Sequence, residues 1–403
     1  MKLARMLLPC LLLLTASGAT ADAPKALAEA LSLQDRGEVL HAGAIAARSG
    51  DSVVVELVTW ARLVDGEGSW GEMARHLDRN PNWPRNPTIR RHAERLMPVG
   101  LDPVWVAGFF ADGALTGTGA QRHAEALQAL GREAEAETVL ERAWTTLPLR
   151  EEERLAMQAD QPALTTRLAP QRLDAMLWEG NLAQAEALLP FVETGWRRLG
   201  AARIALQARR NGVDALVDAV PGAFASDGGL AHDRFVWRWR SDLDDSALAL
   251  IEERSATATA LGRPEAWAHR RAALVRRLMR ADEASRAYRL ASRHHLGQGG
   301  AFAELEWLSG WIALRQLDDP ARAAAHFEAL WKAVSTPISK GRAGYWMGRA
   351  VEAQGDLVAA RRWYARAADY GTSFYGQLAA ERIGRDLTAY LAAGGPRGNR
   401  TLL

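Results

Sequence analysis

Small and apolar residues recur along the chain at spacings that predict pairs of helices. In the clearest copy the positions are Gly348, Gly355, Ala360, Tyr364 and Ala367, in steps of 7, 5, 4 and 3 residues. The steps of 4 and 3 place the last three residues on one face of a helix. Gly355 is expected to end the preceding helix, and Gly348 is expected to let a neighbouring helix approach closely. The pattern therefore predicts a helix hairpin.

Further copies of this hairpin pattern begin at Ala124, Leu173, Ala272 and Gly310, the last with one extra residue in its turn. One hairpin cannot bury its own apolar face, whereas a stack of hairpins forms a continuous core. Ala, Leu, Arg and Glu dominate the composition, and Val, Ile and Thr form no alternating runs, which favours helix over strand. We predict an all-α fold, an α-superhelix (solenoid) of irregular helix hairpins that resemble tetratricopeptide (TPR) units.

The strength of the repeats divides the chain into expected segments. Residues 22–300 are expected to form an irregular α-superhelical domain, and 301–384 TPR-like helix pairs that close the superhelix. Residues 385–403 are rich in glycine and polar side chains and are expected to be a disordered tail.

The first 21 residues have the pattern of a cleavable signal peptide. Lys2 and Arg5 precede an apolar run over 6–14, and Ala19-Thr20-Ala21 is a small-x-small cleavage site. We therefore expect export to the periplasm, cleavage near Ala21, and a mature chain without a transmembrane segment. Cys10, the only cysteine, lies within the signal, so the mature chain offers neither thiol catalysis nor cysteine metal ligands.

Charge argues against general nucleic-acid binding. The whole chain carries 50 basic and 48 acidic residues, and removal of Lys2 and Arg5 leaves 48 of each. A balanced chain lacks the basic surface with which proteins bind phosphate backbones.

Motifs of catalysis and metal binding are absent from the sequence. The acidic clusters 151–153, 242–245 and 318–319 fall at predicted helix starts or turns, where carboxylates favour the helix dipole. No His-Glu-x-x-His pair exists, and His294 and His295, if helical, point apart. The string 116–119 (Thr-Gly-Thr-Gly) resembles a dinucleotide loop, but Arg122 stands where the third glycine belongs. We predict no catalytic residue, no metal site and no cofactor.

A series of short strings, in order, resembles the soluble lytic murein transglycosylases of Gram-negative bacteria. The strongest are 342–350 (Arg-Ala-Gly-Tyr-Trp-Met-Gly-Arg-Ala), 363–368 (Trp-Tyr-Ala-Arg-Ala-Ala) and 374–379 (Phe-Tyr-Gly-Gln-Leu-Ala). Upstream strings agree, among them 80–84, 90–94, 172–178, 201–206 and 307–317, so the resemblance spans about 60–384. It implies a superhelix of irregular helix pairs followed by a lysozyme-like domain. That domain cleaves MurNAc–GlcNAc β-1,4 bonds without water, leaves 1,6-anhydromuramoyl ends, and uses no metal or organic cofactor.

The sequence departs from this family after the Phe-Tyr-Gly-Gln string. Only 19 residues follow Gly384, and the family's Glu-Ser, Gly-Leu-Met-Gln and Ala-Tyr-Asn-Ala-Gly strings are absent. We therefore expect the chain to be inactive by itself. A truncation or frameshift of a longer gene and a natural, catalytically silent scaffold both stay open as explanations.

Two functional interpretations follow. The first is a peptidoglycan-associated protein similar to the family's non-catalytic superhelical part. The alternative is a TPR-like periplasmic scaffold that binds cell-wall enzymes or other proteins. The glycan-binding candidates are Arg342, Trp346, Arg349 and Tyr375. Core packing is the competing role for Trp346 and Tyr375, and pairing with Glu352 or Asp356 is the competing role for Arg349.

Overall fold

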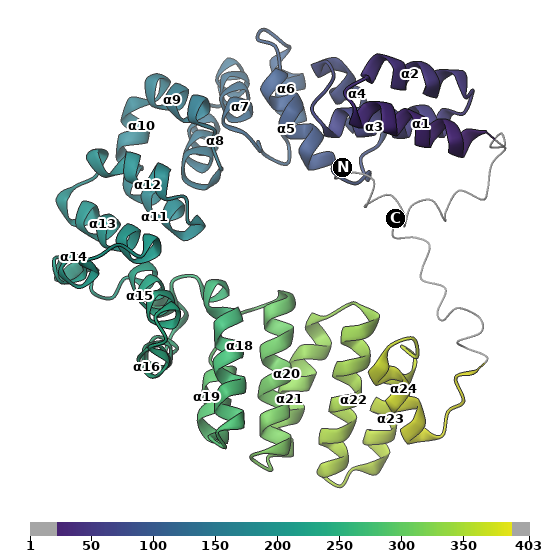
Figure 1. The fold of residues 1–403 in the computed structure, drawn as a ribbon, viewed down its shortest axis with the longest axis vertical. Coiled ribbons are helices and arrows are strands. Elements are labelled where there is room, and N and C mark those ends of the chain that lie inside the picture. The colour runs from purple at the N-terminus through teal and green to yellow at the C-terminus, as the bar shows by residue number, and fades with distance from the viewer. Residues whose placement is uncertain (1–21, 389–403) are drawn as a thin grey trace. The chain divides into compact units, whose positions relative to one another are not determined.

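In the computed structural model, residues 22–388 are described, and within this range the chain consists of helices and their connections, without a strand. The expected all-α fold is confirmed. The contacts divide the chain into two compact units, and the boundary along the chain falls between Arg172 and Leu173. In each unit, consecutive helices lie side by side (Figure 1). The sequence-based boundary between residues 300 and 301 does not coincide with this division and stays a prediction about repeat regularity.

The first unit is built from short helices that each pack on the next one or two along the chain. They are α1 (Ala23–Asp35), α2 (Val39–Arg48), α3 (Ser52–Val64), α4 (Trp70–Arg79), α5 (Asn86–Leu96), α6 (Pro103–Phe109), α7 (Gly117–Ala129), α8 (Glu133–Thr146), α9 (Glu151–Asp160) and α10 (Pro162–Arg167). Helix α11 (Ala169–Glu179) crosses the boundary between the units.

The second unit becomes more regular toward its C-terminal end. Its helices are α12 (Leu182–Leu188), α13 (Thr194–Ala208), α14 (Val213–Asp218), α15 (Gly228–Arg240), α16 (Asp244–Arg254), α17 (Ala258–Leu261), α18 (Pro264–Arg280), α19 (Ala284–Ser292), α20 (Gly299–Arg315), α21 (Pro320–Ala333), α22 (Pro337–Ala353), α23 (Leu357–Ala368) and α24 (Phe374–Ile383), with 3-10 turns at Leu189–Phe191 and Gly222–Phe224. Helices α18, α20, α22 and α24 each contact the next in this series, and α19, α21 and α23 complete the pairs. This alternation is the packing expected of stacked hairpins.

The strongest predicted hairpin is α22–α23, and its signature residues do what the pattern requires. Gly355 has a φ of 87° after the end of α22, and the Asp356 carboxylate accepts a hydrogen bond from the Ala359 N–H at the start of α23. A Cβ on Gly348 would lie 2.5 Å from the Tyr364 ring. Tyr364 is buried and fills the space that this glycine leaves open. The close approach predicted from Gly348 is thus confirmed.

The weaker copies also form pairs of consecutive helices. In α7–α8, α18–α19 and α20–α21 the two helices pack on each other, and α11 and α12 follow each other at the remaining copy. In α20–α21, a Cβ on Gly310 would lie 2.6 Å from the Phe327 ring, which repeats the relationship between Gly348 and Tyr364. The α18–α19 turn uses Asp282, at a φ of 60°, where the other turns use glycine. The same backbone turn is therefore built from different residues, which is why this copy has a weak sequence signal.

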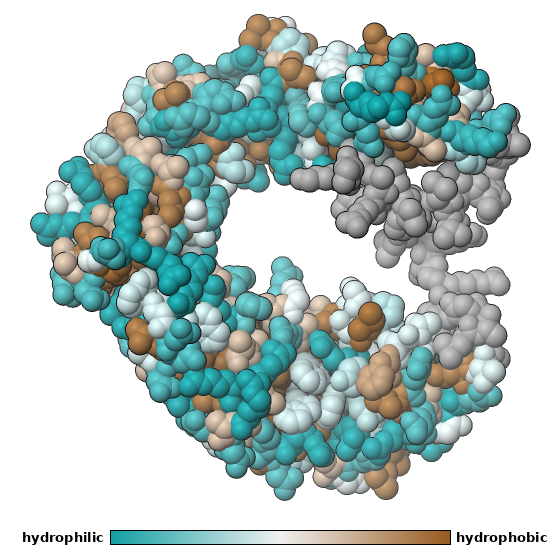
Figure 2. All heavy atoms as spheres, in the orientation of Figure 1, coloured by the Kyte–Doolittle hydropathy of each residue, from teal (hydrophilic) through white to brown (hydrophobic). Residues whose placement is uncertain are grey.

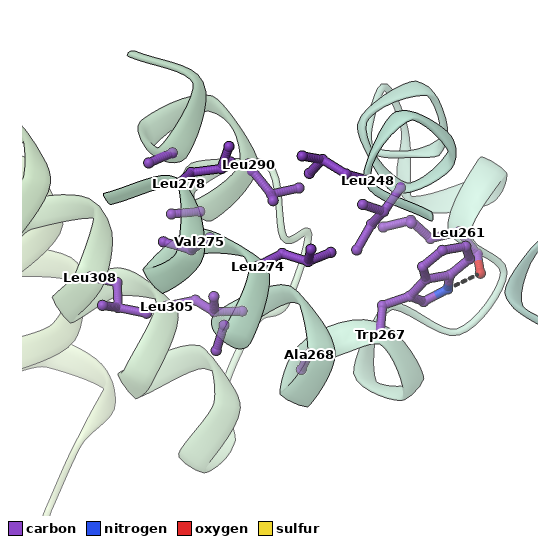
Figure 3. Close-up of a cluster of buried hydrophobic side chains, with 14 of the residues drawn as sticks. Leu248, Leu261, Trp267, Ala268, Leu274, Val275, Leu278, Leu290, Leu305 and Leu308 are labelled. Atoms are coloured by element: carbon purple, nitrogen blue, oxygen red, sulfur yellow. Dashed lines mark hydrogen bonds between the residues drawn. The ribbon is translucent and has the colours of Figure 1, made fainter. Parts of the chain in front are cut away.

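A large core of the second unit joins α15 to α20 around Trp267. Leucine and valine side chains of α16, α18, α19 and α20 fill the space between the helices (Figure 3). The Trp267 side chain is fully buried, and its indole N–H donates a 2.9 Å hydrogen bond to the Leu261 carbonyl at the end of α17. Trp144 is also fully buried, so core packing is the role of both tryptophans.

Buried arginines bind the carbonyl groups at helix ends. The Arg172 guanidinium donates to the Trp144 carbonyl in the last turn of α8, and Arg271 donates to the Leu290 carbonyl in the last turn of α19. Carbonyls in a last turn have no partner within their own helix. Each arginine therefore supplies a hydrogen bond that the helix lacks and ties neighbouring helices together.

The Thr-Gly-Thr-Gly string forms the start of α7 and packs against the buried carboxylate of Glu94. The Thr116 hydroxyl donates a 2.8 Å hydrogen bond to Glu94 and accepts one from the Gly119 N–H. A Cβ on Gly119 would lie 2.4 Å from the Glu94 carboxylate. The glycines serve helix packing, in agreement with the rejection of a dinucleotide loop.

Two predicted segments lie wholly or partly beyond the described range. The predicted signal peptide, residues 1–21, lies outside it, as do residues 389–403 of the predicted tail. Residues 385–388 pack on the last hairpin: Arg385 pairs with Asp369 at 2.8 Å, and Leu387 is buried against α23 and α24.

Hydrophilic side chains cover most of the visible face of each unit, with apolar side chains scattered among them (Figure 2). Among residues 22–388, no helix is both long enough and apolar enough to cross a lipid bilayer.

Candidate functional site

The four candidate residues lie together on α22 and α24. Arg342, Trp346 and Arg349 are spaced 4 and 3 residues apart, so they share one face of α22. Tyr375 lies in the first turn of α24, and its ring centroid is 6.4 Å from that of Trp346. The structure thus brings these residues into one region of the second unit.

Small residues set the position of Tyr375. A Cβ on Gly376 would lie 2.1 Å from the Tyr370 carbonyl oxygen, and a Cβ on Gly341 would lie 2.3 Å from the Ser373 hydroxyl. Ser373 caps α24 by accepting a hydrogen bond from the Gly376 N–H. These close approaches let α24 start directly beside α22, so the glycine of the Phe-Tyr-Gly-Gln string is needed for packing.

An aromatic cluster surrounds Trp346. Its ring lies 6.3 Å from Trp307 of α20 and 5.7 Å from Tyr345, in edge-to-face arrangements. Such pairs stabilise beyond the area that they bury. Trp346 and Tyr375 are each half-buried, so each side chain packs against its neighbours and also exposes part of its surface to solvent. Trp307 is absent from the sequence-based site prediction, although it is among the tryptophans of the family strings.

The two candidate arginines differ in their bonding. The Arg349 Nε lies 3.3 Å from the Glu352 carboxylate, so the pairing that competes with ligand binding is observed. Arg342 lies over the Trp307 ring, 5.4 Å from its centroid, and among the described residues it has no ion pair. Burial lowers the pKa of Arg342, which still leaves this guanidinium charged at neutral pH. Arg342 is therefore the cation of this cluster that remains available.

Three buried N–H groups of the cluster have no acceptor within the described part of the protein. They belong to Arg342 Nε and to the indoles of Trp307 and Trp346. Burial of these donors without an acceptor is a cost to stability. We refer to Trp307, Arg342, Trp346 and Tyr375 as the aromatic–arginine cluster.

Helix α20 also carries a buried carboxylate that the sequence does not indicate. Glu306 precedes Trp307 on α20, and its two oxygens accept hydrogen bonds from His294 Nε2 at 2.9 Å and His326 Nδ1 at 2.7 Å. His294 and His295 lie beyond the last helical residue of α19, so the helical condition under which their rings would point apart does not hold. The two rings do take different partners, since His295 contacts the Ser255 carbonyl.

The hydrogen bonds fix the proton positions in this network. The Leu296 N–H donates to Nδ1 of His294, so the proton of that ring is on Nε2 and is donated to Glu306. With His326 neutral, its Nδ1–H is donated to Glu306 and its Nε2 accepts from the Tyr288 hydroxyl at 2.7 Å. Every member of the Glu306 network then has a partner.

The electrostatics of Glu306 oppose a role as a general acid. Burial alone would raise its pKa, but the hydrogen bonds from His294 and His326 outweigh burial and lower the pKa to about 2. A glycosidase acid needs a raised pKa so that it holds a proton near neutrality. The network is thus suited to joining α20, α21 and the end of α19.

Neither metal binding nor similarity to known proteins assigns a role to this region. Within residues 22–388, no group of three or more His, Asp, Glu or Cys side chains is arranged to hold a metal ion. No protein-family model matches the chain, and no curated protein matches it.

Proposed function

We propose that the mature protein is a periplasmic, peptidoglycan-associated helical scaffold, similar to the non-catalytic superhelical part of a soluble lytic murein transglycosylase. One observation carries the proposal. Within the strings that carry the family resemblance, Trp307, Trp346 and Tyr375 gather beside Arg342, which has no ion pair among the described residues.

The chemistry of the aromatic–arginine cluster suits a murein glycan. Aromatic rings offer apolar faces to the C–H groups of sugar rings. The partly exposed guanidinium of Arg342 offers donors to hydroxyl, carbonyl and carboxylate oxygens. The predicted signal peptide would bring the chain to the compartment where this polymer lies.

Retention by isolated murein sacculi tests the proposal, with purified protein 22–403 and Arg342→Gln as the main variant. Arg366→Gln is the matched control, because Arg366 also lies over a tryptophan, Trp363, but on α23 and outside the cluster. We expect the wild type and the control to be retained and Arg342→Gln to be retained about tenfold less, as for loss of a charged hydrogen bond.

Product analysis of the same incubation tests the non-catalytic part of the proposal. We expect no release of 1,6-anhydromuropeptides. Failure of the wild type to be retained, or equal retention of Arg342→Gln in a variant with unchanged circular dichroism, would overturn murein binding. The scaffold for cell-wall enzymes would then be the remaining interpretation.

A further inference from the structure

A polar cavity lies in the second unit, lined by other helices than those of the aromatic–arginine cluster. It has a volume of about 340 Å³ and lies among the end of α11, the start of α12, and α13, α15 and α18. Leu177, Leu206 and Val236 supply apolar walls. Ligand pockets begin at roughly 300 Å³, so a cavity of this size suits a ligand no larger than one sugar ring or a short peptide.

Two arginines without acidic partners line this cavity. Arg240 ends α15 and Arg270 lies in the middle of α18. Within the described range, neither guanidinium has an ion pair or a hydrogen bond. Burial, and then the nearby charge of Arg240, lower the pKa of Arg270. Two neighbouring cations repel each other, and an anion bound between them would remove this cost.

The acidic groups of the cavity do not supply that anion. Asp233 accepts hydrogen bonds from Arg203 at 2.7 Å and from Gln207 at 3.0 Å, so its charge is already paired. Glu179 also lines the cavity, as an exposed side chain at the end of α11. The charges of the two arginines and the two carboxylates of the lining therefore sum to zero. Asp233 is paired with Arg203, which also pairs with Asp174, so among the described residues the two arginines of the cavity are left without an ion pair.

His232 and Trp178 also line the cavity. Nε2 of His232 is 3.3 Å from the Ala266 carbonyl, so in the neutral ring the proton is on Nε2 and Nδ1 is an acceptor. Nδ1 is buried without a hydrogen-bond partner and lies 3.6 Å from an oxygen of Asp233. This nitrogen is closed off from solvent, so it does not offer the cavity an acceptor. Trp178, whose ring centroid is 5.3 Å from that of His232, completes the wall.

We propose that this cavity binds a small acidic sugar, with its carboxylate between Arg240 and Arg270 and its ring beside Trp178 and the apolar walls. The charge argument is independent of the proposed function, but the choice of N-acetylmuramic acid as the sugar rests on it. N-acetylglucosamine lacks the carboxylate of N-acetylmuramic acid, so the two sugars form a matched pair of probes.

Isothermal titration calorimetry of purified 22–403 with both sugars tests the proposal. We expect N-acetylmuramic acid to bind and N-acetylglucosamine to bind at least about tenfold more weakly, as expected for loss of hydrogen bonds to charged groups. Arg240→Gln and Arg270→Gln should each weaken N-acetylmuramic acid about tenfold. Arg280→Gln should leave binding unchanged, because Arg280 is exposed on α18 and does not line the cavity.

The outcomes separate this site from the murein-binding proposal. Absent binding of N-acetylmuramic acid, equal binding of both sugars, or equal competition by inorganic phosphate and N-acetylmuramic acid would each overturn the acidic-sugar site. Retention by sacculi with no binding of N-acetylmuramic acid would reject this inference alone. If N-acetylmuramic acid bound to the wild type and more weakly to Arg270→Gln, but the protein were not retained by sacculi, the result would support the site and reject murein binding.

Discussion

Nδ1 of His326 lies 2.7 Å from Oε2 of Glu306 and joins α21 to α20 through a buried hydrogen bond. Oε1 of the same carboxylate is bound by His294, which follows α19. One carboxylate therefore connects three consecutive elements of the stack. Since stacked hairpins depend on their nearest-neighbour interfaces, this network stabilises two such interfaces at once.

Replacement of Glu306 should weaken both interfaces. In Glu306→Gln the amide offers one oxygen to two histidine N–H donors, and its NH2 group faces the other donor. We expect the free energy of unfolding at pH 7 to fall by about 1–3 kcal/mol, as for a buried group left unsatisfied. Urea denaturation measures this. Glu328→Gln, at an exposed ion pair with Lys332 on α21, should change stability by less than about 1 kcal/mol.

The contribution of Glu306 should depend on pH in a defined window. Its pKa is lowered from 4.5 to about 2 in the folded protein, so the folded state binds fewer protons than the unfolded state. The stabilisation is complete above pH 4.5 and is lost as pH falls toward 2. The difference in unfolding free energy between wild type and Glu306→Gln should therefore shrink over this range. A difference that stays constant from pH 5 to pH 2 would contradict the pKa assignment.

Two glycine-to-alanine substitutions should have opposite effects. In Gly348→Ala the new Cβ meets the buried Tyr364 ring at 2.5 Å, and overpacking of this kind costs about 1–3 kcal/mol. Gly43 lies within α2, and nothing lies within 4 Å of a Cβ there. Gly43→Ala should stabilise by about 0.5–1 kcal/mol, because alanine loses less backbone entropy in a helix. Thermal unfolding compares the two, and a neutral Gly348→Ala would refute the close approach.

The regular hairpins are predictable from the sequence because their constraints are local. Gly355 and Asp356 are adjacent, and Gly348 faces Tyr364 as Gly310 faces Phe327, with one extra residue in the turn of the second pair. These positions recur at helical spacing, and the glycine and aspartate between the helices mark the turn. The candidate residues on α22 share a helix face, and helical spacing alone groups them.

The Glu306 network and the arginine pair of the cavity carry no such signal. Glu306 and His326 are 20 residues apart, and Arg240 and Arg270 are 30 apart, on helices whose relative rotation depends on packing. Helical spacing within one element does not predict which faces of separate helices meet. The division at Arg172 is equally hidden, because it falls inside the continuous helix α11.

The buried Arg271 should not tolerate lysine. It is fully buried on α18, donates to the Leu290 carbonyl and to the Ser255 hydroxyl, each at 2.8 Å, and its pKa is lowered to about 10 by burial. A lysine ammonium is a single point on a flexible stem and cannot span both acceptors as the planar guanidinium does. We expect Arg271→Lys to lower the unfolding free energy by about 1–3 kcal/mol.

Arg280→Lys is the matched control for Arg271→Lys, because Arg280 is an exposed residue of the same helix. It should leave the urea midpoint within the scatter of the wild type. Equal midpoints for wild type and Arg271→Lys would show that the two hydrogen bonds of Arg271 do not contribute to stability.

Substitution of Arg342 and of Arg349, both on α22, should have different effects on glycan binding and on stability. Arg349 is engaged by Glu352, which also accepts a hydrogen bond from Tyr364 and pairs with Arg382 at 3.3 Å. Arg349→Gln should therefore cost up to about 1 kcal/mol of stability, as for partly exposed ion pairs, and should leave retention by sacculi at the wild-type level. Arg342→Gln should lower retention with a stability change of similar or smaller size, because its cation–π contact with Trp307 is worth about 0.5–1 kcal/mol.

Parallel urea denaturation and sacculus retention of the two variants measure this separation. If Arg349→Gln lost retention as strongly as Arg342→Gln at unchanged stability, the Glu352 pair would not withhold Arg349 from the glycan, and both arginines would belong to the binding surface. If Arg349→Gln instead lost stability and kept retention, α22 would divide its face between Arg342, directed to the ligand, and Arg349, which supports the α22–α23 hairpin through Glu352.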